Sequence, residues 1–156
     1  MNITVEKIRP ENFRRFGKVI GYPDKRQQPQ GRNLFRIVVR ERQPFGWRIA
    51  YLVVRDKSIN RLEQHRDTFE SFEPVKGKSL LYVSDAREKE AIRCFLLDRP
   101  VVLKKGVWHG IVTAARDSEI KISENANVRS LYWRLGNGLV LTSSPGTSKA
   151  ARRQTR

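Results

Sequence analysis

The sequence predicts an all-β domain, folded as a barrel or a sandwich, with one short helix near its N-terminus. After residue 34 the apolar residues occur in short runs that are rich in β-branched and aromatic types, and many of these runs alternate with polar residues. Gly, Pro, Asp or Asn bounds most of the runs, which is typical of strands joined by tight turns. Helical periodicity is hard to find in this part of the chain.

The predicted elements follow one another at close spacing. Residues 10–16 form the expected helix, with Pro10 in its first turn and Gly17 at its end. Residues 18–24 form a brief strand, and residues 24–33 are polar and indicate a loop. The further strands are expected over residues 34–42, 47–55, 59–65, 68–75, 78–84, 91–97, 100–104, 108–114, 119–123, 128–135 and 139–143.

The length of 156 residues predicts a single domain with a true hydrophobic core. We assign residues 1–142 to this domain and residues 143–156 to a flexible basic tail, because the last segment is small, polar and positively charged. Trp47, Trp133 and the phenylalanines are expected in the core.

The net charge of +16 favours an anionic partner, such as a small acid, a nucleic acid or a membrane surface. The basic residues are scattered and form no stripe interleaved with aromatic residues, so nucleic acid is the minority expectation. No segment is long enough to span a bilayer and the N-terminus lacks a secretory signal, so we expect a cytoplasmic protein without a membrane partner. The single cysteine, Cys94, lies in a predicted buried strand and is expected to be an inert thiol.

The chain has two histidines, and each stands in a glycine-bounded segment. In LEQHRDTFESFEPVKG, residues 62–77, strand alternation places Glu63 and His65 on one face, and Glu70 shares a face with Phe72 on the next strand. If these two strands are adjacent and antiparallel, a carboxylate–imidazole pair and a second carboxylate converge.

The second segment, KKGVWHG, places His109 directly after a glycine turn, at the start of another strand. Imidazole nitrogens and carboxylate oxygens together are the ligand set of zinc, nickel, iron or manganese. The alternative is that both histidines are hydrogen-bonded structural residues and that the two glutamates are solvated or paired with arginines.

The spacing of these residues resembles the two conserved motifs of the cupin superfamily. His65, Glu70 and Gly77 match the first motif, and Gly106 with His109 matches the core of the second. The resemblance implies a cupin-type jelly-roll β-barrel, with the motif residues holding one metal inside it. The implied metal ligands are Glu63, His65, Glu70 and His109.

Within the cupins, the sequence resembles the ureidoglycolate lyase family from about residue 7 to residue 136. The segment L-E-Q-H-x6-F-x-P-x-x-G begins at Leu62, IRCF covers residues 92–95, GVWHG covers residues 106–110, and PENFRRFGKVI covers residues 10–20. The family cleaves ureidoglycolate to glyoxylate and urea in purine degradation, and its members are described as metal-linked and commonly dimerise. The resemblance therefore implies a carbon–nitrogen lyase, a divalent metal and a homodimer.

Some residues depart from these patterns. The usual His-x-His pair is Glu63-x-His65 here, Lys104 replaces a proline, and Thr113 replaces an asparagine. Glu70 stands where the lyase family usually has glutamine, and Arg66 replaces a proline after the first histidine. These changes concern the substrate more than the fold, so a non-catalytic small-molecule- or metal-binding cupin and a basic nucleic-acid-binding β-barrel remain the alternatives.

The expected roles follow from the chemistry of ureidoglycolate. The catalytic residues are His65, Glu70 and His109, with His65 or Glu70 as the base if it is not a ligand. A guanidinium would bind the substrate carboxylate, and Arg55 is our first choice for it, ahead of Arg66 and Lys76. Trp108 is expected in the core or in the wall of the cavity, where it would contact the substrate.

Overall fold

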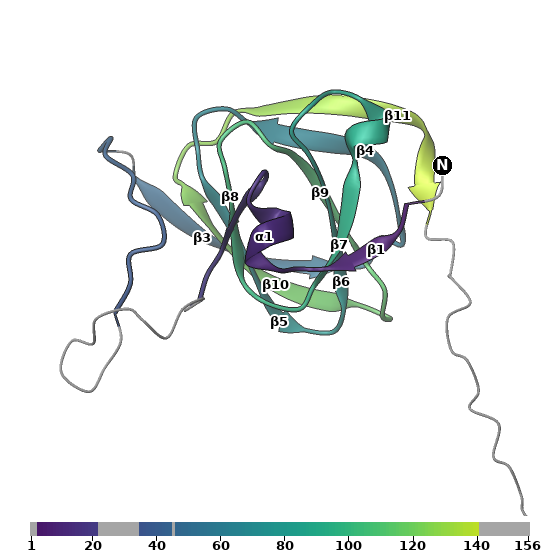
Figure 1. Cartoon of the computed structure of the whole chain (residues 1–156), viewed down its shortest axis with the longest axis horizontal. Helices are drawn as coiled ribbons and strands as arrows, with labels where there is room; N and C mark the ends of the chain where they lie inside the picture. Colours follow the sequence, from purple (N-terminus) through teal and green to yellow (C-terminus); the bar gives the residue numbers. More distant parts are fainter. Residues whose placement is uncertain (1–2, 22–34, 45, 141–156) are drawn as a thin grey trace, which may run out of the picture.

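The structure is a computed structural model of the chain, and it describes residues 3–21, 35–44 and 46–140. This part contains eleven strands in two sheets, one short helix and one 3-10 turn (Figure 1). The elements are β1 (Val5–Lys7), α1 (Pro10–Phe13), β2 (Gly17–Val19), β3 (Trp47–Val54), β4 (Ser58–His65), β5 (Glu70–Lys76), β6 (Ser79–Ser84), η1 (Lys89–Ala91), β7 (Arg93–Leu97), β8 (Val101–Leu103), β9 (Trp108–Thr113), β10 (Ser118–Asn125) and β11 (Ser130–Val140).

The eight strands from β3 to β10 pair in a nested order. β6 pairs with β7, β5 with β8, β4 with β9 and β3 with β10, always antiparallel. The pairs separate into two sheets, ordered β1-β7-β6-β9-β4-β11 and β2-β8-β5-β10-β3. Nested antiparallel pairs divided between two sheets define a jelly roll. The prediction of an all-β jelly-roll barrel with a short N-terminal helix is confirmed.

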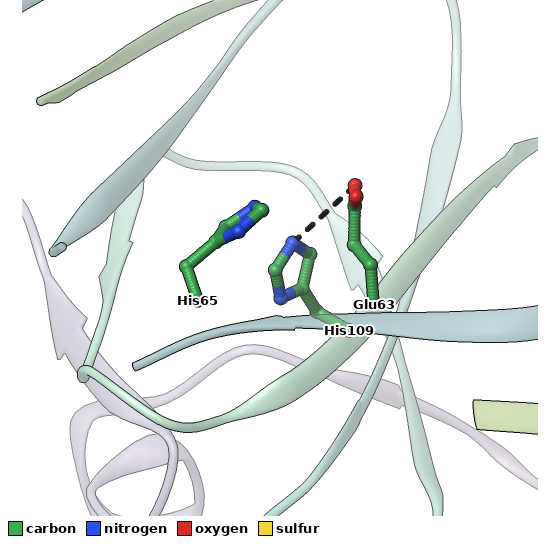
Figure 2. Close-up of side chains that lie close together, drawn as sticks. All are labelled: Glu63, His65 and His109. Carbon is green, nitrogen blue, oxygen red and sulfur yellow. Dashed lines mark ion pairs between the residues drawn. The ribbon is translucent and has the colours of Figure 1, made fainter. Parts of the chain in front are cut away.

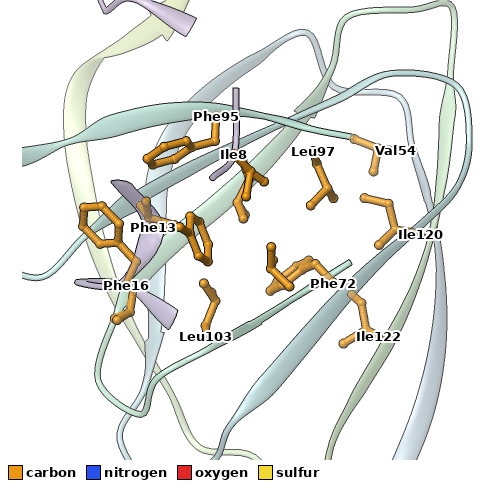
Figure 3. Close-up of a cluster of buried hydrophobic side chains, with 14 residues drawn as sticks. Ile8, Phe13, Phe16, Val54, Phe72, Phe95, Leu97, Leu103, Ile120 and Ile122 are labelled. Carbon is orange, nitrogen blue, oxygen red and sulfur yellow. The ribbon is translucent and has the colours of Figure 1, made fainter. Parts of the chain in front are cut away.

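The hydrophobic core fills the space between the two sheets (Figure 3). Strand β10 shows how alternation builds it, because Ile120 and Ile122 are buried while Lys121 between them is only half-buried. Phe13 of α1 is fully buried and meets the ring of Phe95 edge to face, with 5.2 Å between centroids. Burial of a side chain of this size contributes about 1.5–3 kcal/mol, which explains why so short a helix is held in place.

A second buried cluster lies on the opposite face of the six-stranded sheet. In β6, Leu81 belongs to the core between the sheets, whereas its neighbour Tyr82 belongs to this outer cluster. Trp108 and Trp133 also lie in the outer cluster and meet edge to face at 5.9 Å. The expectation that Trp133 lies in the barrel core is therefore corrected to this outer layer. The prediction that Trp47 lies in the core is also wrong, since 71% of its surface is exposed.

Several predicted boundaries differ from the structure. The helix ends at Phe13 rather than at residue 16. A strand was predicted over residues 34–42, but the described residues 35–42 form none and pair with neither sheet. The two last predicted strands are one long strand, β11, whose register with β4 shifts between Arg134 and Leu139.

The sequence analysis did not predict strand β1, which pairs parallel with β7 at the edge of the six-stranded sheet. The predicted basic tail, residues 143–156, lies outside the described residues. Among the described helices, none has the length and apolar character needed to cross a membrane.

Candidate metal centre

The four predicted ligands come together inside the jelly roll, where several strand ends meet. His65 is the last residue of β4, Glu70 is the first of β5, and His109 is the second of β9. Glu63 lies directly opposite His109 in the β4–β9 pairing. Figure 2 shows the two imidazole rings side by side, with the Glu63 carboxylate next to His109.

Glu70 joins the two histidines. Its Oε2 atom lies 2.9 Å from His109 Nε2 and 3.5 Å from His65 Nε2. Glu63 Oε1 lies 3.7 Å from His109 Nε2, and the two imidazole centroids are 5.1 Å apart. One donor atom from each of Glu63, His65 and His109 lies within 4.8 Å of the other two. The predicted convergence is therefore present in the structure.

The route to this convergence differs from the prediction. Strands β4 and β5 were expected to pair with each other, but β4 lies in the six-stranded sheet and β5 in the five-stranded sheet. The residues between them carry the chain from one sheet to the other. Glu70 therefore faces the histidines across the barrel interior rather than along a shared ladder.

The turn before β9 fixes the position of His109. Gly106 has a φ of +80°, a left-handed conformation that favours glycine. Its N–H donates to the carbonyl of His65 at 2.7 Å, and its own carbonyl accepts from Gln64 Nε2 at 2.7 Å. These two hydrogen bonds, one between backbone groups and one from the Gln64 side chain, connect the turn before β9 to the end of β4 and so hold the two histidines near each other.

The second nitrogen of each imidazole contacts the protein. His109 Nδ1 lies 3.1 Å from the carbonyl of Val107. His65 Nδ1 lies 3.4 Å from the carbonyl of Arg129 and 3.4 Å from Ser130 Oγ. When Nδ1 carries the proton and donates to a carbonyl, Nε2 is left as the electron-pair donor. In both histidines it is Nε2 that faces the carboxylates, as a metal ligand requires.

The centre contains polar atoms that the protein does not satisfy. Glu70 Oε2 and His109 Nε2 are buried and lie 2.9 Å apart, which is an ion pair only when the imidazole is protonated; with a neutral imidazole neither atom has a hydrogen-bond partner among the described residues. Burial lowers the pKa of His109, but the contacts with the Glu70 carboxylate, the Val107 carbonyl and the Glu63 carboxylate together outweigh it, and the net shift of this pKa is upward. A divalent ion would satisfy both atoms and offset the buried carboxylates, so these residues fit a metal.

The structure also brings in a carboxylate that the sequence analysis missed. Glu124 lies on β10 with its side chain only 6% exposed, and its donor atom is within 4.8 Å of those of His65 and Glu70. Arg48 on β3 binds it. The signal was present in the sequence, because Glu124 falls on the same strand face as Ile120 and Ile122.

The predicted substrate-binding residues do not join this cluster. Arg55 follows the end of β3 that pairs with Ser118, and Lys76 pairs with Glu119. These positions lie five residues (Lys76) and seven residues (Arg55) along the β10 direction from Glu124, or roughly 17–23 Å. Lys76 binds Glu119 at 3.2 Å on the surface, and Arg55 is exposed.

Trp108 and Arg66 also point elsewhere. Trp108 is buried in the outer cluster and therefore lies on the opposite face of β9 from His109. The Arg66 Nε donates to Gln64 Oε1 at 3.4 Å. Glu63 and His109 instead line a pocket of about 330 Å³ whose wall includes Arg61, a guanidinium that the sequence analysis overlooked. A larger pocket of about 610 Å³, beside Arg129, contains neither histidine.

Comparison with known proteins gives only distant structural likeness. No protein-family model and no curated protein matches the chain. A mutant of Bacillus subtilis oxalate decarboxylase matches 58% of this chain at 14% identity and a TM-score of 0.44, and the match spans 24% of the decarboxylase chain. A cupin 2 domain-containing protein from Halorhodospira halophila matches at 16% identity and a TM-score of 0.43, over 60% of each chain. This likeness assigns neither a family nor an activity.

Proposed function

We propose that this chain is a metal-dependent cupin-type lyase that cleaves the carbon–nitrogen bond of ureidoglycolate or of a related small 2-hydroxy acid. The observation that carries the proposal is the convergence of two imidazole Nε2 atoms and two carboxylates inside a jelly roll. The substrate is proposed from the resemblance of the LEQH, IRCF and GVWHG segments to the ureidoglycolate lyase family.

The metal would be held by Glu63, His65, Glu70 and His109. Two nitrogen and two oxygen donors suit manganese, iron, nickel or zinc. When bound, such an ion supplies Lewis acidity toward the hydroxyl and carboxylate oxygens of the substrate. The remaining tasks, which are binding the substrate and moving one proton, belong to the protein.

The reaction requires the transfer of one proton from the substrate hydroxyl to the leaving nitrogen. The hydroxyl of ureidoglycolate loses its proton, its electron pair forms the carbonyl of glyoxylate, and the carbon–nitrogen bond breaks with its electrons on nitrogen. That nitrogen then takes the proton to give urea, so the step is balanced without a redox partner. Although Glu70 is proposed here as a ligand through Oε2, which is directed at the two imidazoles, its Oε1 is free of that contact, and we assign the proton transfer to Oε1.

The substrate carboxylate needs a cation near the ligands. Arg61 lines the same pocket as Glu63 and His109, and its guanidinium lies 4.8 Å above the ring of Tyr132. An arginine positioned by an aromatic ring can bind a carboxylate with two parallel hydrogen bonds. We therefore assign this role to Arg61 in place of Arg55.

The test combines elemental analysis with an assay of glyoxylate release from ureidoglycolate. The wild-type chain should carry about one transition metal ion and turn over the substrate. His65→Ala and His109→Ala should lose both metal and turnover while remaining folded. Lys76→Ala is the matched control and should keep both, because Lys76 binds Glu119 at the surface. Unchanged activity in both histidine variants would remove the mechanism.

The non-catalytic cupin is the second candidate. Glu63 in the place of a usual histidine and Glu70 in the place of a usual glutamine favour it, since both changes fall among the ligands. This candidate predicts metal binding, lost in the histidine variants, without release of glyoxylate. The homodimer and the nucleic-acid partner stay predictions. A nucleic-acid complex would weaken steeply with added salt and would not depend on either histidine.

A further inference from the structure

Glu124 is an ionisable residue on an otherwise buried strand face. It follows Ser118, Ile120 and Ile122 on the inward face of β10, and all four residues are buried. A carboxylate at such a position carries a large desolvation cost unless it has partners. The partners of Glu124 therefore indicate what the residue does.

Arg48 satisfies only one of the two carboxylate oxygens. Its Nε and Nη2 atoms donate to Glu124 Oε1 at 3.0 Å and 2.8 Å, directly across the β3–β10 pairing. The second oxygen, Oε2, is buried and has no hydrogen-bond partner. Arg48 thus fixes the orientation of the carboxylate and leaves one oxygen available on the inside of the barrel.

That available carboxylate stands beside the metal centre. One donor atom from each of His65, Glu70 and Glu124 lies within 4.8 Å of the other two, and all three residues are buried. Glu70 Oε2 also contacts the Nε2 atoms of both His65 and His109. The Glu124 group therefore shares His65 with the group of Glu63, His65 and His109, and Glu70 links the two groups through its contact with His109.

The charges of this group do not balance within the protein. Arg48 pairs with Glu124, whereas among the described residues the ion-pair partners of Glu63 and Glu70 are the two imidazoles, which must be neutral to act as ligands. A divalent cation restores neutrality. We propose that Glu124 is an additional ligand of the cation in this cavity, positioned by Arg48; this inference rests on the proposed metal site.

The added carboxylate changes which ion the site prefers. Three carboxylates and two imidazoles form an oxygen-rich set, whereas structural zinc takes four nitrogen, sulfur or oxygen ligands in a tetrahedron. Carboxylate ligands suit Mn²⁺, and five or more donors suit ions of higher coordination number. Glu124 therefore raises the affinity for Mn²⁺ more than the affinity for Zn²⁺.

Calorimetric titration of the full metal-free chain with Mn²⁺ and with Zn²⁺ tests this. Glu124→Gln keeps the size of the side chain and an oxygen for Arg48 but removes the charge and the donor oxygen. The affinity for Mn²⁺ should fall by about tenfold or more, and the affinity for Zn²⁺ should fall less. Glu119→Gln is the matched control, because Glu119 lies on the opposite face of β10 and binds Lys76; it should bind both ions as the wild type does.

The outcomes separate the two proposals. If the wild-type chain binds neither ion, the metal site itself fails. If the wild type binds and His109→Ala does not, but Glu124→Gln keeps both affinities, Glu124 is only a structural partner of Arg48 and the inference is overturned. Should Glu124→Gln not fold, Arg48→Gln leaves the carboxylate unpositioned, and the affinity for Mn²⁺ should then fall severalfold; an unchanged affinity also overturns the inference.

Discussion

Glu70 Oε2 and His109 Nε2 lie 2.9 Å apart in the interior of the barrel, and within the described residues neither atom has a hydrogen-bond partner. The two residues lie on strands of different sheets, β5 and β9, so the contact spans the interior between the sheets. Such an arrangement costs folding free energy, and bound metal would recover it.

Replacing Glu70 with glutamine should therefore weaken metal binding and abolish turnover. The amide keeps the shape of the side chain but provides neither the charge nor the proton-accepting oxygen. Glu73→Gln on the same strand is the control, because Glu73 binds Lys121 at the surface at 2.8 Å. Metal content and glyoxylate release are measured on both variants. Equal metal affinity in Glu70→Gln and Glu73→Gln would show that Glu70 is not a ligand.

Gly106→Ala should destabilise the protein through the backbone alone. A Cβ at this position would meet no atom within 4 Å, so the cost is that of the left-handed conformation, about 1–2 kcal/mol. The variant should also bind metal more weakly, because Gly106 connects β9 to the carbonyl of His65. Gly21→Ala is the control, since Gly21 also has open space and its φ is not positive. Urea unfolding and metal titration compare the two; equal effects would contradict this role of Gly106.

Cys94 should be unreactive in the folded protein and should make stability fall at high pH. Burial raises the pKa of its thiol from 9.0 to about 12. The folded state therefore favours the neutral thiol, and the resulting stability is fully present below pH 9 and is lost as the pH rises toward 12.

Two measurements check this prediction for Cys94. A thiol reagent at pH 8 should modify the protein only in denaturant. Between pH 8 and pH 10.5 the wild type should lose more unfolding free energy than Cys94→Ala does. Rapid modification of the native protein, or the same pH dependence in both proteins, would contradict a buried neutral thiol.

Trp108→Phe separates a packing role from a substrate-binding role. Trp108 packs on Trp133 in the outer cluster, on the far face of β9 from His109. The substitution should lower the free energy of unfolding by about 1–3 kcal/mol and leave the metal affinity unchanged. Loss of metal or substrate affinity without loss of stability would return Trp108 to the cavity wall, as the sequence analysis allowed.

Trp47 should be the tryptophan that iodide quenches. It is 71% exposed on the edge strand β3, whereas Trp108 and Trp133 are each 7% exposed. Trp47→Phe should remove most of the quenchable fluorescence at low protein concentration. The same experiment tests the predicted homodimer, because protection of Trp47 that grows with protein concentration would place β3 in a contact between two copies.

Alternation and spacing were enough to predict the two-faced strands and the convergence of Glu63, His65 and Glu70. The alternation in Glu63-x-His65 and the glycine before His109 are local features, so they do not depend on which strands pair with each other. Pairing itself is not local. For that reason the sequence placed β4 beside β5, although the two strands lie in different sheets.

The local sequence also could not predict which tryptophans are buried or which arginine contacts a carboxylate of the site. Trp47 and Trp133 both lie on edge strands, but Trp133 packs within an outer cluster that only the folded chain creates. Arg48 lies near the start of β3 and Arg55 directly follows its end, and the β3–β10 register decides which of them meets the Glu124 carboxylate. This register cannot be predicted from the local sequence and is known only from the structure.

The nested pairing of the strands also bears on how fast the protein can fold. The β6–β7 hairpin closes over a short stretch of chain, but β3 must find β10 across about 60 intervening residues. Topologies dominated by such distant pairings fold slowly. The contact between Arg48 and Glu124 belongs to this last pairing, so we expect the cavity to reach its full set of carboxylates only at the end of folding, and capture of the ion to report the final step of barrel closure.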